Sequence, residues 1–550
     1  MNFNRTNLYI TITLASFRTN KIIRGAMLKQ LNLKKLSYII IFLSLIFGLY
    51  ILSFVVINFS DYSGDQINDA YRIMATWDGK WPTLGSGPTA WSGLVGEFYL
   101  PPLYYYLVFP FTALTADLSA QAMPNALLTF LSIPLLILTS YKLLENVEHN
   151  QRLFLSALAG FWYICLFENI VMSTGHSIAG NPVSITFFLL CFVLLYTYQM
   201  EGKLSPNLEL LSWMAYGLVL AILSNLHFSS LYVMPVVFII TVIFYISRNY
   251  REKRRWLLSG VAAFTAILAM TPYWIGEIGR NWVNTARIIA IVTKSSGGKE
   301  YSLSILSRFK AIFNGYFGLG QEVYFFGESS KSLIISIIFL GLVLVLGSLK
   351  FRGNRILLNV LFLIWSIFLL AYSSTDMEKT YNPTFYKLLI YLAPIVFTVC
   401  SLAYINFPKR VNQVLSGFII ACITLSIVIN LNLHHNYINS RSGIPRVLST
   451  HDIADSLRKL PEKSTLCQPN GNPRNLRNDE YIDRFVTKRD LKFVPNCQPG
   501  FYIIHAKYES LGNFKLKKDE KFPSELAKYQ NTAQLVAETP LYYVYLLSGS

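Results

Sequence analysis

The sequence has 550 residues, of which 53% are hydrophobic and only 14% are charged. A soluble protein usually carries about 25% charged residues, so this composition excludes an ordinary soluble enzyme. Lys and Arg number 48 against 30 Asp and Glu, which gives a net charge of +18. Such a charge is also typical of proteins that bind nucleic acid, so the positions of the cations must decide between the two interpretations.

Long apolar runs recur along the first four-fifths of the chain. Most approach or exceed the roughly 18–20 residues that a helix needs to cross a bilayer. We expect helices, because backbone in lipid must satisfy its own hydrogen bonds and the runs lack the alternation of a barrel strand. The sequence predicts eleven spans, at 37–58, 120–141, 153–172, 182–199, 208–226, 229–247, 256–275, 331–349, 355–373, 385–406 and 413–431.

The cations mark one side of the predicted bundle. The first 36 residues hold seven Lys or Arg and no acid, and five more cations lie at 248–255. Basic residues favour the cytoplasmic side of short loops, so both segments are expected inside. The same count places the loops 59–119 and 276–330 and the chain after residue 431 outside. The net charge therefore reports membrane topology, and we expect no nucleic-acid partner.

Two stretches do not read as spans. The apolar stretch 101–114 is only about fourteen residues long, which favours a short helix packed against the bundle. The chain after residue 431 is richer in charges and in Pro, Asn and Gly. Three segments follow: a basic N-terminal segment (1–36), a transmembrane domain (37–431) and a soluble domain (432–550).

The soluble domain is expected to be small and of the α/β or α+β class. Its sequence favours a helix at 452–460 and strands at 500–505 and 541–547. Cys467 and Cys497 are its two cysteines, and we predict that they form a disulfide in an oxidising compartment. The other four cysteines lie in predicted spans, where a small apolar packing role is expected.

The first outside loop is the densest polar region near the predicted bundle. Asp65 and Asp69 are four residues apart, so on a helix they share a face and repel each other. That repulsion calls for a nearby cation or a proton-accepting role. The alternative is that both acids are simply solvated at the membrane surface.

Three motifs in this region resemble a known family. They are Gly64-Asp65-Gln66-x-x-Asp69-Ala70, then Trp81-Pro82-x-Leu84-Gly85, then Pro101-Pro102-Leu103-Tyr104-Tyr105-Tyr106. Together they resemble bacterial members of glycosyltransferase family 39, relatives of the protein O-mannosyltransferases and the aminoarabinose lipid A transferases in the GT-C superfamily. The resemblance extends from residue 37 to about 430 and is strongest over 60–145.

The resemblance implies a fold and an activity. The fold is a polytopic helical GT-C-like bundle with juxtamembrane helices in its first outside loop. The activity is transfer, with inversion, of a sugar from a polyprenyl-phosphate donor to an extracytoplasmic lipid, glycan or protein. The family's defining acid after the first span matches Asp65, the expected base, with Asp69 and Glu97 in support. Such a base takes the acceptor's proton while cations stabilise the departing phosphate.

Further residues are candidates for binding the donor or the acceptor. Cations in the outside loops suit a lipid phosphate, although they also suit anionic lipid headgroups. The substrate-binding candidates are Asp61, Arg72, Tyr104, His227, Arg280, Arg287, Lys379, Tyr386 and Lys387. Some relatives contain a divalent metal ion, and Asp65, Glu97 and His176 are the residues here that could surround one.

Two other functions remain open at this point. A transporter or flippase of lipid-linked sugars would use internal repeats and charges within the membrane, and a non-catalytic envelope assembly protein would act through its soluble domain. In every case the sequence predicts a multi-pass protein of a bacterial cytoplasmic membrane, with its N-terminus inside and its C-terminal domain outside.

Overall fold

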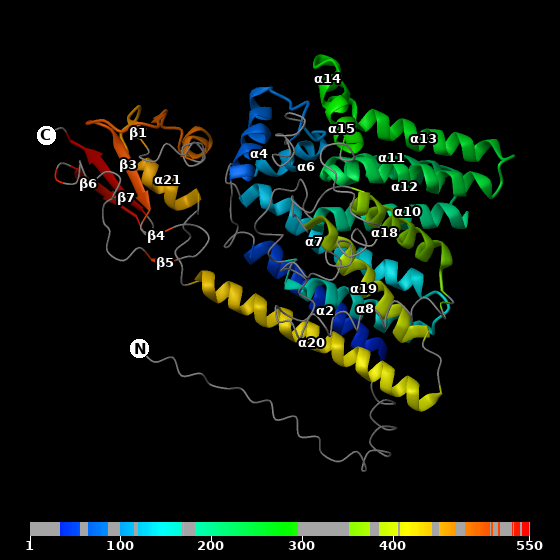
Figure 1. Cartoon of the computed structure of the whole chain (residues 1–550). Helices are drawn as coiled ribbons and strands as arrows, with labels where there is room; N and C mark the ends of the chain where they lie inside the picture. The colour runs from blue at the N-terminus through cyan, green and yellow to red at the C-terminus, as the bar shows by residue number, and fades with distance from the viewer. Residues whose placement is uncertain are drawn as a thin grey trace, which may run out of the picture.

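The computed structural model is a bundle of helices with a small domain at its C-terminal end (Figure 1). It describes residues 33–55, 64–85, 99–114, 119–167, 169, 182–294, 351, 353–374, 384–404, 408–442, 450–467, 479–506, 508–509, 515–516, 531, 533–539 and 542–548. Everything below concerns these residues.

The long helices follow the apolar runs. They are α2 (Leu33–Tyr50, continued by the π-helical turn η1, Ile51–Val55), α7 (Ser119–Leu143), α8 (His149–Cys165), α10 (Pro182–Glu201), α11 (Pro206–Leu226), α12 (Phe228–Ser247), α13 (Lys253–Ala269), α18 (Arg355–Ser374), α19 (Thr384–Tyr404) and α20 (Lys409–Ser442). Ten of the eleven predicted spans coincide with one of them, and the span 331–349 lies outside the described residues.

A stricter criterion of length and hydropathy selects fewer helices. Within the described ranges, five are long and apolar enough to cross a membrane, and a bent pair brings the number to six. The bent pair is α13 with α14 (Thr271–Gly279), which differ in direction by 55°. Pro272 lies in the first turn of α14, where its missing N–H is tolerated. A multi-pass membrane protein is therefore confirmed, whereas a total of eleven spans is not.

Short helices gather where the bundle meets the C-terminal domain. They are α4 (Gly64–Ala75, followed by the 3-10 turn η2, Thr76–Asp78), α6 (Leu103–Thr112), α14 and α15 (Val283–Lys294). We call this the domain end of the bundle. The ten-residue α6 matches the short helix expected from the stretch 101–114.

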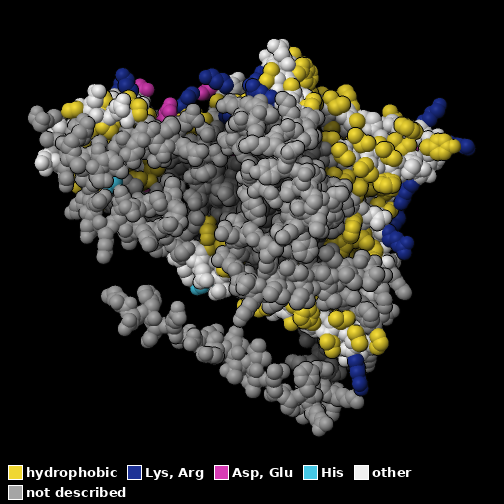
Figure 2. Space-filling view, viewed as in Figure 1, with side chains coloured by type: hydrophobic (Ala, Val, Ile, Leu, Met, Phe, Trp, Pro, Cys, Tyr) yellow, Lys and Arg dark blue, Asp and Glu magenta, His cyan; other side chains and the backbone are white. Residues whose placement is uncertain are grey.

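The bundle core is apolar and aromatic. Trp162, Trp213 and Tyr216 are its largest fully buried side chains. Gly217 allows α11 and α13 to approach closely, because a Cβ at this position would lie 2.0 Å from the backbone oxygen of Ala262. Many large apolar side chains of α2, α11, α12 and α13 instead face outward, as Figure 2 shows for part of the surface. Such a surface suits a lipid environment.

Cations mark the opposite end of the bundle, which we call the basic end (Figure 2). Here the buried carboxylate of Glu201 accepts hydrogen bonds from Lys142 Nζ at 2.6 Å and from Asn354 Nδ2 at 2.9 Å. Arg254 pairs with Glu209 at 2.9 Å. At the basic end one ion pair therefore joins α7 to α10 and another joins α11 to α13, while Asn354, just before α18, adds a hydrogen bond to α10.

The C-terminal domain is built on a mixed five-stranded sheet. Its elements are α21 (Thr450–Arg458), β1 (Thr465–Cys467), the π-helical turn η4 (Asp483–Thr487), β2 (Lys492–Val494), β3 (Tyr502–Ala506), β4 (Tyr508–Glu509), β5 (Lys515–Leu516), β6 (Ala533–Glu538) and β7 (Tyr542–Leu547). The sheet order is β2-β1-β3-β7-β6, with β2, β1 and β3 parallel and the last two pairings antiparallel. The predicted helix and both predicted strands are present.

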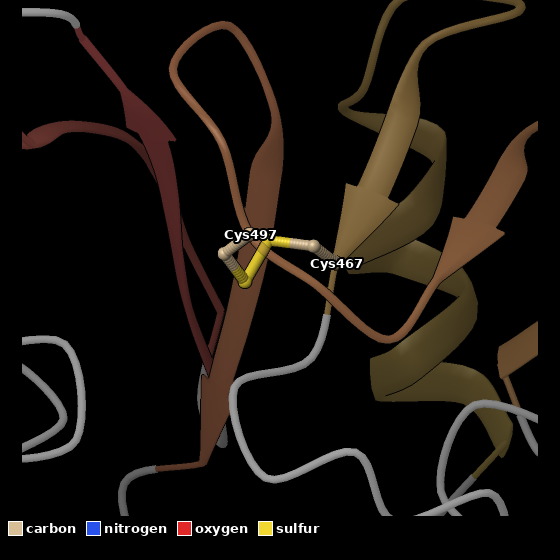
Figure 3. The surroundings of a disulfide bond; sticks show 2 residues. All are labelled: Cys467 and Cys497. Atoms are coloured by element: carbon tan, nitrogen blue, oxygen red, sulfur yellow. A yellow bond between two sulfur atoms is a disulfide. The ribbon is translucent and has the colours of Figure 1, made fainter.

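A disulfide joins Cys467 and Cys497, the pair expected from the sequence (Figure 3). It connects the end of β1 to the segment that follows β2, with a Cα–Cα distance of 5.2 Å. Because the cysteines are 30 residues apart, the crosslink restricts the unfolded chain and stabilises the domain by about 3–4 kcal/mol.

Candidate active site at the domain end

Helix α4 carries three of the candidate residues. Asp65 lies in its first turn, and Asp69 and Arg72 follow one and two turns later on the same side. The side chain of Asp69 is 2% exposed, so the alternative of a freely solvated acid does not hold for this residue. The side chain of Asp65 lies outside the described part of the chain.

A buried network links α4 to α6. The Tyr105 hydroxyl donates a hydrogen bond to Asp69 Oδ1 at 2.6 Å. Arg72 Nη1 donates to the Tyr105 hydroxyl at 3.1 Å and to the backbone oxygen of Gly85 at 2.8 Å. Burial, and after it the Asp69 carboxylate, raises the pKa of Tyr105 well above its usual value, so the phenol stays protonated and can donate. Asp69 thus holds Tyr105, which in turn orients Arg72.

Two buried asparagines hold the segment between Tyr99 and Leu103. Asn284 of α15 accepts from Tyr99 N at 2.5 Å and donates to Tyr99 O at 2.7 Å. Asn225, near the end of α11, accepts from Leu103 N at 3.0 Å. The prolines between these two positions have no N–H to donate, so side-chain amides at either end fix the position of the segment.

Gly85 joins this segment to the chain that follows α4. Its N–H donates to the backbone oxygen of Leu100 at 2.6 Å. A Cβ on Gly85 would lie 2.8 Å from the backbone oxygens of both Leu100 and Pro101, so only glycine fits. Since Arg72 binds the carbonyl of Gly85, this close approach also fixes the guanidinium.

The turn between α14 and α15 depends on a buried glutamate. Asn281 and Trp282 have positive φ angles of 53° and 60°, which is unfavourable for residues with a Cβ. Glu277 stabilises the turn, because its Oε2 accepts from the backbone N and the hydroxyl of Thr285 at the start of α15. Glu277 is fully buried and its Oε2 caps this helix, so it is not a solvated acid.

The turn directs Arg280 towards Tyr99. The guanidinium carbon of Arg280 lies 4.8 Å from the centre of the Tyr99 ring, and that of Arg72 lies 5.9 Å from it. Among the described residues, no carboxylate is within ion-pair distance of either arginine. Two guanidiniums without an ion-pair partner among the described residues therefore converge on one aromatic ring beside α4, and the charge of Asp69 also acts on Arg72. This arrangement is suited to binding a phosphate group.

The other candidates are distributed as follows. Tyr104 is 3% exposed, packs beside Tyr105 and belongs to the bundle core. His227 follows α11, two residues after Asn225, and Arg287 lies on α15. Tyr386 and Lys387 lie on α19, but their side chains are outside the described residues, as are Asp61, Glu97 and Lys379 altogether.

A metal site was also tested. Among the described side chains, no group of three His, Cys, Asp or Glu residues could hold an ion. Glu97, His176 and the side chain of Asp65 lie outside them, so the metal remains a prediction. The sequence did not single out Tyr99, Tyr105, Asn225 or Asn284 as site residues. For Asn225 the sequence did offer a signal, because a polar residue within an apolar run indicates a buried polar contact or a site.

Neither a scan against protein-family models nor a search of curated proteins finds a match to the sequence. Solved structures are similar in fold. ArnT from Cupriavidus metallidurans, crystallised with undecaprenyl phosphate, is 11% identical, with 96% of this chain and 99% of that chain covered and a TM-score of 0.50. Its apo form gives a TM-score of 0.48 at 11% identity, with 96% and 100% covered.

An apo oligosaccharyltransferase from Archaeoglobus fulgidus gives a TM-score of 0.45 at 10% identity, with 86% of this chain and 69% of that chain covered. At such identities the likeness concerns the fold alone, and only the match to ArnT bound to undecaprenyl phosphate is strong enough to be used. That match extends over nearly the whole of both chains, the C-terminal domain included. The chain therefore has the fold of ArnT, in agreement with the motif resemblance.

Proposed function

We propose that this protein is an integral-membrane glycosyltransferase that moves a sugar, with inversion, from a polyprenyl-phosphate donor to an acceptor. One observation carries the proposal: Arg72 and Arg280 converge on Tyr99 with no carboxylate at ion-pair distance among the described residues, beside the helix whose first turn contains Asp65. The fold shared with ArnT, which was crystallised with undecaprenyl phosphate, supports the choice of donor.

The proposed chemistry assigns a separate task to each charge. Asp65 accepts the proton of the acceptor hydroxyl as its oxygen bonds to the anomeric carbon. The bond from that carbon to the donor phosphate breaks, and the phosphate leaves with the electron pair. Arg72 and Arg280 balance the negative charge that develops on the phosphate, which is a task for preorganised cations.

Asp69 takes a supporting part in this proposal. Its contact with Tyr105 keeps Arg72 in place, so it contributes to phosphate binding through two hydrogen bonds. Glu97 keeps its predicted supporting role beside Asp65. Arg287, Lys379 and Lys387 are further cations for the donor headgroup, and Asp61, Tyr104, Tyr386 and His227 remain candidates for binding the substrates. No step of the proposal needs a metal ion.

The orientation is proposed from charge and redox chemistry. The basic end, with Arg248, Arg254 and their neighbours, lies in the cytoplasm, as basic residues between spans favour. The domain end and its disulfide then lie in the oxidising space outside a bacterial inner membrane. The acceptor is an extracytoplasmic lipid, glycan or protein.

The purified protein, reconstituted in vesicles, should be incubated with a panel of radiolabelled polyprenyl-phosphate sugars and membrane extract. We expect label to move to lipid, glycan or protein, and Asp65→Asn to abolish this transfer while the protein is still extracted as a folded species. Lys253→Gln, at the exposed basic end, is the matched control and should transfer at the normal rate.

Each outcome has a clear meaning. Full activity of Asp65→Asn would contradict the proposed base. Movement of an intact labelled donor across the vesicle membrane, without transfer, would favour a transporter. Absence of any donor-dependent reaction in the wild type would favour a non-catalytic assembly role.

A further inference from the structure

Helix α4 is buried on two adjacent sides. On one face Asp69 and Ile73 are 2% and 0% exposed and point into the bundle, where Ile73 joins the main core. On the other face Ala70 and Met74 are 0% and 7% exposed and join the core of the C-terminal domain. At 100° per residue the two sides are about 100° apart, just over a quarter-turn, and Tyr71 lies a further 100° round on the side away from Asp69. The helix is therefore shared by the two cores (Figure 1).

Aromatic contacts dominate the face towards the domain. The ring of Tyr71 lies edge-on to Tyr481, with centroids 5.3 Å apart, and 6.0 Å from Phe485. Tyr481 is fully buried and also contacts Phe485 at 5.0 Å. Beyond the helix, Asp78 pairs with Arg484 at 2.9 Å, but both side chains are about half exposed, so the pair adds little.

Hydrogen bonds to Asp483 stabilise the part of the C-terminal domain that contacts Tyr71. Asp483 is 3% exposed, and its carboxylate accepts three hydrogen bonds: from the Thr487 hydroxyl at 2.6 Å and from the backbone N of Arg489 and Leu491 at 3.1 and 2.8 Å. These bonds fix the turn η4, which adjoins Tyr481 and contains Phe485. A defined surface of the domain, and not a loose loop, thus meets Tyr71.

Helix α4 cannot hold its own position. It has only 12 residues, and helices of about this length are marginal in isolation. Its placement is set by packing on both faces, yet Asp65, Asp69 and Arg72 depend on that placement. Removing the contacts on the domain face would leave the candidate active-site face of α4 attached by one side only.

We propose that the C-terminal domain is a positioning element of the active site, which acts by packing Tyr481 and Phe485 against Tyr71 of α4. The consequence for catalysis rests on the proposed function, whereas the mechanical coupling does not. Tyr71 and Tyr481 are positioning residues that contact neither substrate.

The coupling can be measured without any substrate. Thr76 follows Asp69 and Ile73 at helical spacing and is 4% exposed, so a cysteine there should react slowly with maleimide. Combining Thr76→Cys with Tyr71→Ala or with Tyr481→Ala should raise the labelling rate at least tenfold, because α4 loosens as a whole. Protein without the Thr76 substitution gives the background of the native cysteines.

Transfer and binding give the second readout. Both alanine variants should lower the transfer rate at least tenfold and weaken the binding of undecaprenyl phosphate in detergent. Tyr481→Phe keeps the ring and should restore both, and Leu535→Ala, on an exposed part of the edge strand β6, should change neither. Tyr71→Ala leaves the sequence of the domain intact, so it separates loss of coupling from unfolding of the domain.

The outcomes are distinguishable. Wild-type labelling of Thr76→Cys in both alanine backgrounds would overturn the positioning role. Normal transfer and binding by Tyr71→Ala would overturn its consequence for the site. If the wild type transfers no sugar but the labelling rates rise as expected, the proposed function fails and the coupling stands.

Discussion

The two ends of the bundle treat cations in opposite ways. At the basic end, Lys142 and Arg254 have carboxylate partners at 2.6 and 2.9 Å. At the domain end, Arg72 and Arg280 face Tyr99, with no carboxylate within ion-pair distance among the described residues. The difference teaches that a count of charges does not locate a site. Compensated cations hold helices together, whereas uncompensated ones are available to an anionic ligand.

The largest effect is expected at the uncompensated end. Arg72→Gln and Arg280→Gln should each lower kcat/KM for the polyprenyl-phosphate donor about 100-fold, because each removes a cation from the developing phosphate charge. Steady-state kinetics of label transfer would measure this. An unchanged kcat/KM in both variants would show that Arg72 and Arg280 do not stabilise the donor phosphate.

Breaking the compensated end should affect stability instead. Lys142→Met leaves Glu201 with the amide of Asn354 and the exposed ammonium of Lys203 at 3.8 Å but without its close ammonium partner, which should cost about 2 kcal/mol of bundle stability. Thermal unfolding in detergent would detect the loss, while KM for the donor should stay constant. A rise in that KM would show that the two ends are not independent.

A smaller stability effect is expected in the C-terminal domain. Asp483→Ala removes the acceptor of three hydrogen bonds and leaves the buried N–H of Leu491 unpaired, which should cost about 1–2 kcal/mol. Protease resistance of the domain would report it. The exposed Asp455, paired with Arg458 on α21, offers a matched control, since Asp455→Ala should leave resistance unchanged.

The smallest effect is a dependence of domain stability on pH. Asp479 is partly accessible, yet burial raises the pKa of its carboxyl from 3.8 to about 7; the charges of Asp479 and Asp452 both act on Tyr542. The folded state binds the proton of Asp479 more tightly than the unfolded state does. The stabilisation that this protonation gives to the domain is therefore fully present below about pH 4 and is lost as the pH rises to about 7. Asp479→Asn should flatten the pH profile of protease resistance in this range.

Much of the bundle could be predicted from the sequence, because membrane spans are local features. An apolar run long enough to cross lipid must be helical, whatever it packs against. The short α6 was also predictable from its length. The bend at Met270 and the extension of α20 to Ser442 were not foreseen, since packing and not hydropathy sets such boundaries.

The charged residues of the candidate site could be predicted from the sequence. The residues that hold them in place could not, since they come from distant positions in the chain. Asp69, Arg72 and Arg280 followed from motifs and charge. Asn284, by contrast, binds Tyr99 across 185 residues. Arg484 donates a hydrogen bond to Asp78, 406 residues away. The local sequence of α4 therefore does not indicate that the helix packs against the C-terminal domain. The buried, helix-capping position of Glu277 is likewise set by the fold and not by its local sequence.

The central claim is that Arg72 and Arg280 bind the phosphate of a polyprenyl donor. Binding of undecaprenyl phosphate to the purified protein, measured with the Arg72→Gln/Arg280→Gln double variant beside wild type and Lys253→Gln, tests it most directly. We expect the double variant to bind at least 100-fold more weakly and Lys253→Gln to bind normally. Equal affinity of the double variant and wild type would contradict the claim.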